Sequence, residues 1–368
     1  MACFDKPVLV VGAGPTGLTL AAALRWRGIP CRIIEQRRDR SETSRAMGIQ
    51  ARTLDVLAKL SLADAVMRES LPLKGQVFHL GSGVVRSQFQ GAHPGYPAMT
   101  ILPQARTEQL LERAAPPVEW GSTFRGLEEG NVARISDARG KTERIEASWI
   151  VACDGAHSHV RQSAGIPFTG LEYPARLLLA DIELEGLEAG FFHVFTGQAM
   201  IAFKAPGGYW RLVVALPDTA PEPAHHSIVP FQRDGIRLGP LHWWSTFRIH
   251  QRRASTLRVG RVLLAGDAAH IHSPAGGQGM NVGIQDAWSL AVALSQGEEA
   301  VTAWCETRSR VADRVLKASD RMTRAMLPGA RWLAPVRDGF IRLAASSRRV
   351  SAHMEADLAG LRYPEIAG

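Results

Sequence analysis

The sequence has little cysteine. Its 368 residues include four cysteines, Cys3, Cys31, Cys153 and Cys305, which lie far apart and form no CxxC motif. Disulfide-stabilised domains and structural zinc sites both depend on suitably spaced cysteines. The sequence therefore predicts no disulfide framework and no zinc site.

Long apolar runs are also absent. No stretch of 18 apolar residues occurs, and the N-terminus has neither the basic segment nor the long apolar segment of a signal peptide. We therefore expect a cytoplasmic protein without a membrane span.

The chain has an excess of positive charge but no basic run. Its 43 Lys and Arg residues exceed its 35 Asp and Glu residues, giving a net charge of +8. The largest basic groups are small, at residues 37–40 and at Arg252 and Arg253, and no RNA-binding motif accompanies them. The charge favours an ordinary solvated surface first and anionic cofactors second. We expect no nucleic-acid partner.

The chain opens with a βαβ pattern. Residues 7–12 (PVLVVG) form a short apolar run that predicts a buried strand, and residues 14–27 predict a helix that ends at Gly28. Residues 31–35 (CRIIE) predict a second buried strand. Such an opening is typical of a parallel sheet covered by helices.

The rest of the chain alternates between two kinds of pattern. Helices are predicted at 52–65, 107–115 and 283–294, strands at 149–153 and 262–265, an antiparallel sheet across 177–216, a loop at 217–230, and helices from Val301 onward with breaks at Pro328 and Pro335. The fold class is therefore α/β: a Rossmann-like domain with an inserted antiparallel β-sheet domain and a helical C-terminus.

A glycine-rich turn joins the first strand to the first helix. Residues 12–17 (GAGPTG) match GxGxxG, whose glycines permit the tight turn, the approach of backbone to a pyrophosphate and close packing of helix on strand. The helix N-terminus offers free N–H groups to phosphates. Glu35 ends the next strand, where a carboxylate accepts hydrogen bonds from ribose hydroxyls. The sequence therefore predicts an adenine dinucleotide.

Two further motifs identify which dinucleotide. Residues 154–161 (DGAHSHVR) follow the strand at 149–153, and residues 260–270 (GRVLLAGDAAH) continue into 274–281 (PAGGQGMN) and a helix that contains Asp286. With the first motif, in this order and spacing, they resemble the class A flavin-dependent aromatic hydroxylases, the single-component family typified by para-hydroxybenzoate hydroxylase. The pattern is most similar to the polyketide and phenol hydroxylases.

The resemblance implies a domain division. Residues 1–75, 100–168 and 256–325 would form a discontinuous FAD-binding domain, residues 76–99 and 169–255 a substrate-binding β-sheet domain, and residues 326–368 a C-terminal helical segment. Residues 357–364 resemble the point at which a thioredoxin-like domain begins in polyketide and phenol hydroxylases. We therefore expect that extra domain to be missing.

The resemblance also implies the residues that bind FAD. Residues 44–48 (SRAMG) and 102–104 (LPQ) resemble family segments whose Arg and Gln contact the cofactor. Independently of the family, Asp267 can accept hydrogen bonds from ribityl hydroxyls, and the helix that begins near Met280 would aim its positive end at the flavin. The expected cofactor-binding residues are Gly12, Gly14, Pro15, Thr16, Gly17, Glu35, Gln36, Arg45, Gln104, Asp154, Gly155, Arg161, Gly266, Asp267, Pro274, Gly277, Gly279, Met280 and Asn281.

The expected reaction is hydroxylation of an aromatic compound. The resemblance implies that NADPH or NADH reduces FAD and that O2 then forms a flavin C4a-hydroperoxide. His250, Pro274 and Gly277 are the candidates at the reacting ring, although a histidine at 250 departs from the arginine of the type member. The candidates for the substrate wall are His193, Phe195, Met200, Phe203, Trp210, Arg211 and Trp243. Because side chains alternate along a strand, only about half of them can lie on one face of the sheet.

Several alternatives remain open at this point. The chain could be an epoxidase or a Baeyer–Villiger-type oxygenase, or a flavin-binding scaffold that does not hydroxylate. Asp267, His270 and His272 could suggest a metal, and Ser273 a hydrolase triad, but neither metal-ligand spacing nor a GxSxG motif supports them. We expect no metal.

Overall fold

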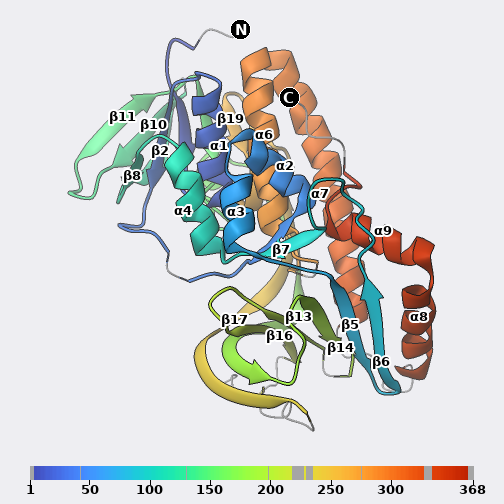
Figure 1. Ribbon diagram of the computed structural model, residues 1–368. Coiled ribbons are helices and arrows are strands. Elements are labelled where there is room, and N and C mark those ends of the chain that lie inside the picture. The colour runs from blue at the N-terminus through green and yellow to red at the C-terminus, as the bar shows by residue number, and fades with distance from the viewer. Residues whose placement is uncertain are drawn as a thin grey trace.

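The computed structural model describes residues 4–41, 43–129, 131–197, 199–217, 228, 235–274, 276–326 and 334–363. Figure 1 shows a layered α/β region at one end of the molecule and a curved antiparallel sheet at the other. The long helix α7 (Glu298–Met326) runs from the first region toward the C-terminal helices. The predicted fold class is confirmed.

A six-stranded sheet forms the core of the α/β region. Its central strand, β1 (Val8–Val11), pairs in parallel with β2 (Cys31–Glu35) and with β12 (Trp149–Ala152). All four residues of β1 are buried, as expected for a strand covered on both faces. The full order is β18 (Arg258–Val259), β19 (Val262–Leu264), β12, β1, β2 and β8 (Val118–Trp120).

The parallel register brings three strand ends together. Val11 is paired with Ala152, and Ala152 with Leu264. The residues that follow these strands therefore lie at one edge of the sheet, where α/β proteins bind ligands. Helices α1 (Pro15–Trp26) and α6 (Gly279–Gln296) start at this edge and pack against each other.

The second large sheet has eight strands and is mostly antiparallel. Two of its strands are 18 residues long, which the sequence did not predict, and they pair along most of their length. The order is β20 (His270–Ile271), β17 (Arg237–Ala254), β13 (Phe168–Glu185), β16 (Trp210–Pro217), β15 (Met200–Lys204), β14 (Phe191–Phe195), β5 (Gly75–Leu80) and β6 (Gly83–Gln88). Strand β20 lies within the third motif, between the Gly266–Ala268 turn and residues 274–281, so this sheet reaches the ligand-binding edge of the first.

Two small antiparallel sheets complete the strands. One lies beside the parallel sheet and contains β11 (Thr142–Glu146), β10 (Val132–Ser136) and β9 (Thr123–Glu128). The other contains β3 (Gly48–Gln50), β7 (Met99–Ile101) and β4 (Leu71–Pro72).

One predicted helix is wrong in its extent. The segment predicted as a single helix over 52–65 is two helices, α2 (Ala51–Lys59) and α3 (Ala63–Glu69). Ser61 lies between them with a φ of 59°, a left-handed conformation that no α-helix continues through. Helix α4 (Gln104–Ala114) begins at the end of the 102–104 segment, and α5 (His159–Ser163) begins within the 154–161 motif.

The C-terminal helices depart from the prediction at one proline. Helix α8 (Ala334–Ser346) contains Pro335 in its first turn, where a proline is tolerated, so this residue starts a helix instead of breaking one. Helix α9 (Arg348–Leu358) follows. Pro328 and most of the predicted 217–230 loop lie outside the described residues.

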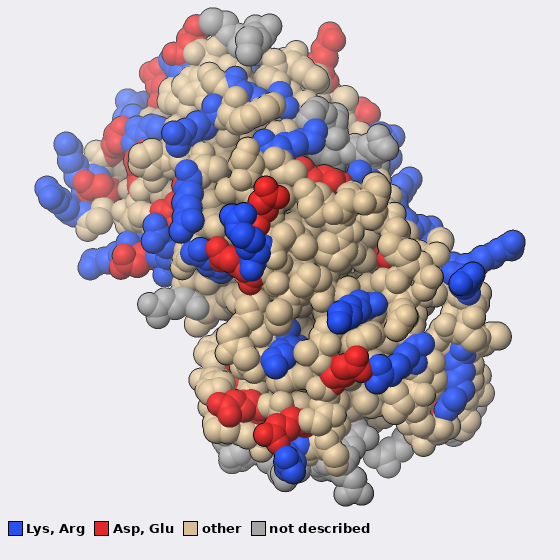
Figure 2. Space-filling view, in the orientation of Figure 1, with Lys and Arg blue, Asp and Glu red and all other residues tan. Residues whose placement is uncertain are grey.

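The surface agrees with a scattered charge pattern. On the face shown in Figure 2, basic residues are dispersed among acidic and uncharged ones. No helix in the described part of the chain combines the length and the apolar character needed to cross a bilayer.

Candidate functional site

Two glycines of the first motif are required by backbone packing. Gly12 has a φ of +103°, and a Cβ on it would lie 2.4 Å from the carbonyl oxygen of Cys153. A Cβ on Gly17 would lie 1.8 Å from the carbonyl oxygen of Gly12. Both separations are too short for real atoms, so the turn and its contact with the second motif exist only with glycine.

Gly14 is different, because it faces open space. A Cβ on Gly14 would meet no atom within 4 Å, and Gly14 is the residue that caps the N-terminus of α1. The first N–H groups of a helix have no partner within it and attract anions. The space beside Gly14 therefore fits a diphosphate.

Thr16 lies where the first and third motifs meet. A Cβ on Gly266 would lie 2.5 Å from Thr16 Oγ1, and a Cβ on Gly283 would lie 2.3 Å from the same oxygen. The start of α1 is therefore packed tightly between the Gly266–Ala268 turn and α6. Sequence reasoning missed the role of Gly283, although a glycine inside a helical pattern is a recognised sign of close packing.

Glu35 closes the glycine turn from the neighbouring strand. Its Oε2 accepts a hydrogen bond from the backbone N–H of Ala13 at 2.9 Å, and its Oε1 accepts one from the N–H of Arg37 at 3.0 Å. The side chain is buried, whereas Gln36 beside it is exposed. A ribose next to Gly14 would meet this carboxylate, as predicted for an adenine dinucleotide.

Asp154 caps a helix and retains one unpaired oxygen. Its Oδ2 accepts hydrogen bonds from the N–H groups of His159 at 2.8 Å and Val160 at 3.3 Å, at the start of α5. Its Oδ1 is buried and has no hydrogen-bond partner among the described residues, and burial raises the pKa of this carboxyl. An acceptor in this state fits a ligand hydroxyl.

Arg161 links the second motif to the third. Its guanidinium is buried, donates to the carbonyl oxygens of Ala268 and Ala156 at 2.9 Å each, and lies 3.8 Å above the ring of Phe168. These contacts fix the turn that carries Asp267. A contact of Arg161 with a cofactor pyrophosphate stays a prediction.

A network of buried charges around Asp286 on α6 holds the third motif in place. Asp286 accepts hydrogen bonds from His270 Nε2 at 2.8 Å, from the N–H of Gly266 at 3.3 Å and from Arg308 Nε at 2.5 Å. Burial raises the pKa of Asp286, but Arg308 and His270 outweigh it, so the pKa lies below its ordinary value. The carboxylate stays ionised and holds the Gly266 turn in place.

Asp267 differs from its buried neighbours in the turn. Its side chain is exposed, yet protein surrounds it closely enough for burial to raise the pKa of its carboxyl. Exposure in such surroundings is typical of a concave ligand site. Asp267 is thus available to a ligand, while its neighbours in the turn are held by the protein.

Asn281 anchors the loop at 276–279. It is fully buried; its Oδ1 accepts from the N–H of Gln50 at 2.9 Å, and its Nδ2 donates to the carbonyl oxygens of Gly48 at 2.9 Å and Gly277 at 2.8 Å. Pro274 and Gly277 are exposed, so this part of the loop can face a ligand. Ala275 lies outside the described residues.

The predicted Arg45 and Gln104 lie together. Gln104 Oε1 accepts from the N–H of Ala46 at 3.3 Å, and Arg211 donates to the carbonyl oxygen of Arg45 at 3.2 Å. The Arg45 side chain is exposed, and its charge lowers the pKa of Asp267 in part.

One face of the eight-stranded sheet lies toward these motifs. Phe203 is paired with Arg211, Arg211 with Asp181, and Asp181 with Trp243, so the four side chains share a face. Phe203 packs in a cluster with Met47 and Met99, and Met99 Cε would lie 3.7 Å from a Cβ on Gly277. The structure thus brings three predicted substrate residues to the side of the 276–279 loop.

The other predicted wall residues lie on the opposite face. His193, Phe195, Met200 and Trp210 are buried there, and His193 Nδ1 lies 3.0 Å from His79 Nε2. Phe195 stacks on the His79 ring at 4.1 Å. The structure does not bring these side chains to the glycine turns.

His250 is also separated from the Phe203 face. Ile249 packs with Leu177 on that face, and neighbouring residues of a strand point to opposite sides. His250 is half-buried, with Nδ1 3.6 Å from an oxygen of Glu172. Its predicted role at the flavin stays a prediction.

His272 is the neighbouring side chain that could suggest a metal. In the described residues, however, no group of three or more His, Cys, Asp or Glu side chains could hold a metal ion. Burial lowers the pKa of His272 to about 4, so its ring is neutral at pH 7.

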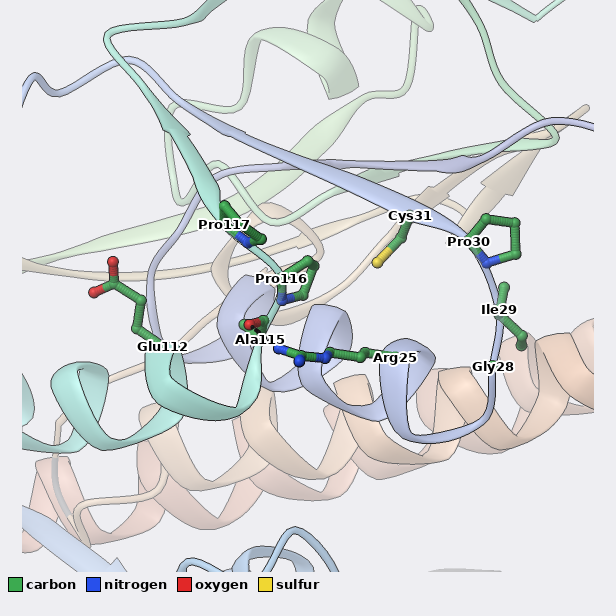
Figure 3. Close-up of a pocket in the computed structure, with 9 residues that line it drawn as sticks. All are labelled: Arg25, Gly28, Ile29, Pro30, Cys31, Glu112, Ala115, Pro116 and Pro117. Carbon is green, nitrogen blue, oxygen red and sulfur yellow. Dashed lines mark hydrogen bonds between the residues drawn. The ribbon is translucent and has the colours of Figure 1, made fainter.

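A surface pocket lies elsewhere. Figure 3 shows it between α1 and the start of β2, lined by Arg25, Cys31, Glu112 and Pro116 among others, with a volume of about 670 Å³. This is the amino-terminal edge of the parallel strands, opposite to the edge that binds nucleotides. Burial raises the pKa of Cys31 to about 11, so this thiol is not a nucleophile at neutral pH. We assign the site to the glycine turns instead.

The fold and the three glycine turns together are those of a dinucleotide-binding protein. A family model described as an FAD binding domain matches residues 5–213 and 216–319. The chain therefore belongs to the FAD binding domain family, and FAD is its cofactor.

The curated relatives are monooxygenases. A flavin-dependent monooxygenase of Mycobacteroides abscessus is 34% identical, covering 89% of this chain and 76% of the relative. The pentachlorophenol 4-monooxygenase of Sphingobium chlorophenolicum is 31% identical (86% and 64%), and the 6-methylpretetramide 4-monooxygenase of Streptomyces rimosus is 33% identical (97% and 70%). The chain thus spans between 64% and 76% of the length of these relatives. It belongs with the flavoprotein monooxygenases.

A solved structure supports the fold. The p-nitrophenol 4-monooxygenase PnpA of Pseudomonas putida DLL-E4 superposes with a TM-score of 0.85, covering 97% of this chain and 98% of that one at 22% identity.

Proposed function

We propose that this chain is an FAD-dependent monooxygenase that hydroxylates a phenolic or polyketide-like aromatic compound with NAD(P)H and O2. Relatives named for a chlorinated phenol and for a polyketide support this substrate class. The oxygenases that epoxidise or perform Baeyer–Villiger oxidation are less well supported, because the names of these relatives concern aromatic rings.

The observation that carries the proposal is the contact of three remote segments around Thr16. Gly12 lies against Cys153, and Thr16 lies against Gly266 and Gly283. Each of these segments also carries a group that the protein leaves available: the free space at Gly14, the unpaired Oδ1 of Asp154 and the accessible Asp267. An extended dinucleotide carries phosphates and hydroxyls along its length, and these residues are of the types that bind such groups.

The bound flavin would supply the electron transfer from the nicotinamide and the activation of oxygen. The chain's own residues bind and orient it. The N-terminus of α1 would hold the diphosphate, Glu35 the adenosine ribose and Asp267 the ribityl chain. The N-terminal turn of α6 would place its positive end near the ring, where negative charge gathers on reduction.

The sheet face that carries Phe203 and Trp243 would form the substrate wall. Its aromatic and aliphatic side chains exclude water from the reacting ring, which strengthens every polar contact there. Arg211 on this face is already paired with Asp181 and donates to the carbonyl oxygens of Ser44 and Arg45. It therefore offers no free cation to a carboxylate, which favours a phenolic substrate over a carboxylated one.

The domain division follows from the same proposal. Residues 1–75, 100–168 and 256–325 would hold FAD, and residues 76–99 and 169–255 would hold the substrate. We further propose a cytoplasmic location, where NAD(P)H is supplied and where thiols stay reduced. The described cysteines, Cys31, Cys153 and Cys305, are all free.

One experiment tests the function. The purified chain is loaded with FAD, and a panel of phenols and polycyclic phenols is screened for stimulated NAD(P)H oxidation under ¹⁸O2, with mass spectrometry of the products. We expect one labelled oxygen in a hydroxylated product. Bound flavin without stimulation by any aromatic compound would favour a flavin-binding scaffold and contradict the proposal.

A further inference from the structure

A C-terminal strap, residues 355–363, lies against the flavin loop at 276–279. The strap begins on the last turns of α9 and is anchored by Glu355, which is 1% exposed. The carboxylate of Glu355 accepts hydrogen bonds from the N–H groups of Gln90 at 2.5 Å and of Gly91 and Ala92 at 2.9 Å. Three donors on one buried carboxylate fix this end of the strap.

The middle of the strap packs on the strand and helix that hold Asn281. The fully buried Ala359 accepts a hydrogen bond from the N–H of Arg52 at 3.1 Å. Gly360 has a φ of +73°, and a Cβ on it would lie 2.8 Å from Gln50 Oε1. Gln50 in turn donates its N–H to Asn281. The strap is therefore connected to the loop through Gln50, beside a residue 360 whose positive φ favours glycine.

The end of the strap reaches the loop directly. Tyr363 packs against Val282, Val311 and Val315, and its hydroxyl donates to Gln278 Oε1 at 2.5 Å. Burial raises the pKa of Tyr363 to about 12, so the hydroxyl keeps its proton at neutral pH and can act as a donor.

Gln278 transmits this contact to the turn. Its side chain is buried at the residue that precedes α6, and its Nε2 lies 3.5 Å from the Cβ position of Gly276. Met322 Sδ lies at the same distance on α7. The Gln278 amide and Met322 thus confine Gly276, and Tyr363 holds the amide in that orientation.

We propose that Tyr363 is a positioning residue for the flavin: its hydroxyl orients Gln278 and so holds the 276–279 loop and the first turn of α6 in the shape that receives the isoalloxazine ring. The inference rests on FAD binding at this loop. It assigns to the strap a role in the cofactor's electronic environment, in addition to its packing.

The test compares Tyr363→Phe with Tyr173→Phe. Tyr173 is the control, because it is a buried tyrosine whose hydroxyl also donates to side chains, those of Asp320 and Gln251. FAD affinity is measured by quenching of flavin fluorescence, and the visible spectrum and midpoint potential of the bound flavin are recorded. We expect Tyr363→Phe to weaken FAD binding about tenfold, or about 1.4 kcal/mol, and to shift the spectrum and potential. Tyr173→Phe should change FAD affinity by less than about twofold. It should leave the visible spectrum and the midpoint potential unchanged within error.

A second pair of variants reaches the same bond from the loop. Gln278→Ala alone and together with Tyr363→Phe completes a double-mutant cycle in FAD affinity. We expect the double variant to bind FAD no more weakly than Gln278→Ala. Additive effects, or a Tyr363→Phe protein with the wild-type spectrum and affinity, would overturn the inference. If Tyr363→Phe does not fold, an unchanged spectrum in Gln278→Ala would overturn it as well. A wild-type chain that binds no FAD would instead refute the proposed function.

Discussion

At the scale of single residues, the site divides into groups that the protein has already satisfied and groups that it leaves accessible. Some side chains already form hydrogen bonds with the backbone or with buried partners, namely Asn281, Arg161 and Asp286. Asp267 stands out because it is exposed within a closely packed setting. A side chain of this kind is where a single substitution should affect the ligand and spare the fold.

Asp267→Ala is therefore expected to weaken FAD binding by roughly tenfold to a hundredfold, since a hydrogen bond to a charged group contributes about 1.5–3 kcal/mol. Binding is measured by flavin fluorescence quenching, with the melting temperature of the FAD-free protein as a check on folding. Asp137→Ala, in an exposed turn, is the control. Retention of full affinity in Asp267→Ala would remove this residue from the site.

The pH dependence of FAD binding should follow the same carboxyl. Burial raises the pKa of Asp267, with His270 and Arg45 lowering it in part. Only the ionised form accepts from hydroxyls without restriction, so affinity should be full above this raised pKa and should fall as the pH decreases through it. The fall should begin at a higher pH than an ordinary aspartate would give. Asp267→Asn should abolish this dependence; the same profile in the Asn variant would assign it to another group.

At the scale of helices and strands, the site depends on how closely α1, α6 and α7 approach the third motif. Arg308 on α7 reaches Asp286 on α6, which holds the N–H of Gly266. Thr16 on α1 fills the space that two glycines leave open. These contacts join the three helices to the turn that carries Asp267.

Arg308→Met should destabilise the protein strongly, because it leaves Asp286 charged and buried. Loss of one partner of a buried pair costs about 3–5 kcal/mol, and chemical denaturation measures it. Arg237→Met is the control: Arg237 pairs with Glu185 where both are exposed, and such pairs contribute under about 1 kcal/mol. Equal losses in the two variants would contradict the role of burial.

Gly283→Ala should destabilise by about 1–3 kcal/mol, the usual cost of overpacking, since its Cβ would lie 2.3 Å from Thr16 Oγ1. Thr16→Ala in the same chain should restore much of the loss by removing that oxygen, and urea denaturation of the two proteins measures both effects. A double variant as unstable as the single one would mean that α1 and α6 do not meet at this point.

The elements that sequence could predict are those with a local signature. Residues 8–11 and 31–35 are buried strands because their β-branched run allows little else, and α1 begins where Gly14 ends the turn. The 18-residue strand β17 depends on a distant partner strand, which no local pattern encodes. The same holds for Gly283, whose contact is with Thr16, and for Tyr363, whose contact is with Gln278. Both partners are far away in the sequence. The three motifs themselves were visible because each is contiguous.

At the scale of the whole molecule, the eight-stranded sheet has two faces with different duties. One carries Phe203 and Trp243 toward the cofactor side, and the other buries Phe195 in the sheet's own core. Alternation along a strand gave the sequence no means to choose between them, because both faces are apolar. The predicted wall residues therefore divide between the two faces, and we expect only the set with Phe203 and Trp243 to meet a substrate.

Removal of an aromatic side chain should therefore affect substrate binding on one face of the sheet and stability on the other. Trp243→Ala should raise KM for the aromatic substrate roughly tenfold, equivalent to about 1.4 kcal/mol, with little change in melting temperature, because this side chain is only half-buried. Phe195→Ala should cost about 3–5 kcal/mol of stability, because its ring is 1% exposed and stacked on His79, and KM should stay near the wild-type value in the folded fraction. Steady-state kinetics and thermal denaturation of both variants separate the two effects. The assignment of faces would be reversed if Phe195→Ala changed KM and Trp243→Ala did not, since substrate would then contact the side of the sheet that the fold uses as core.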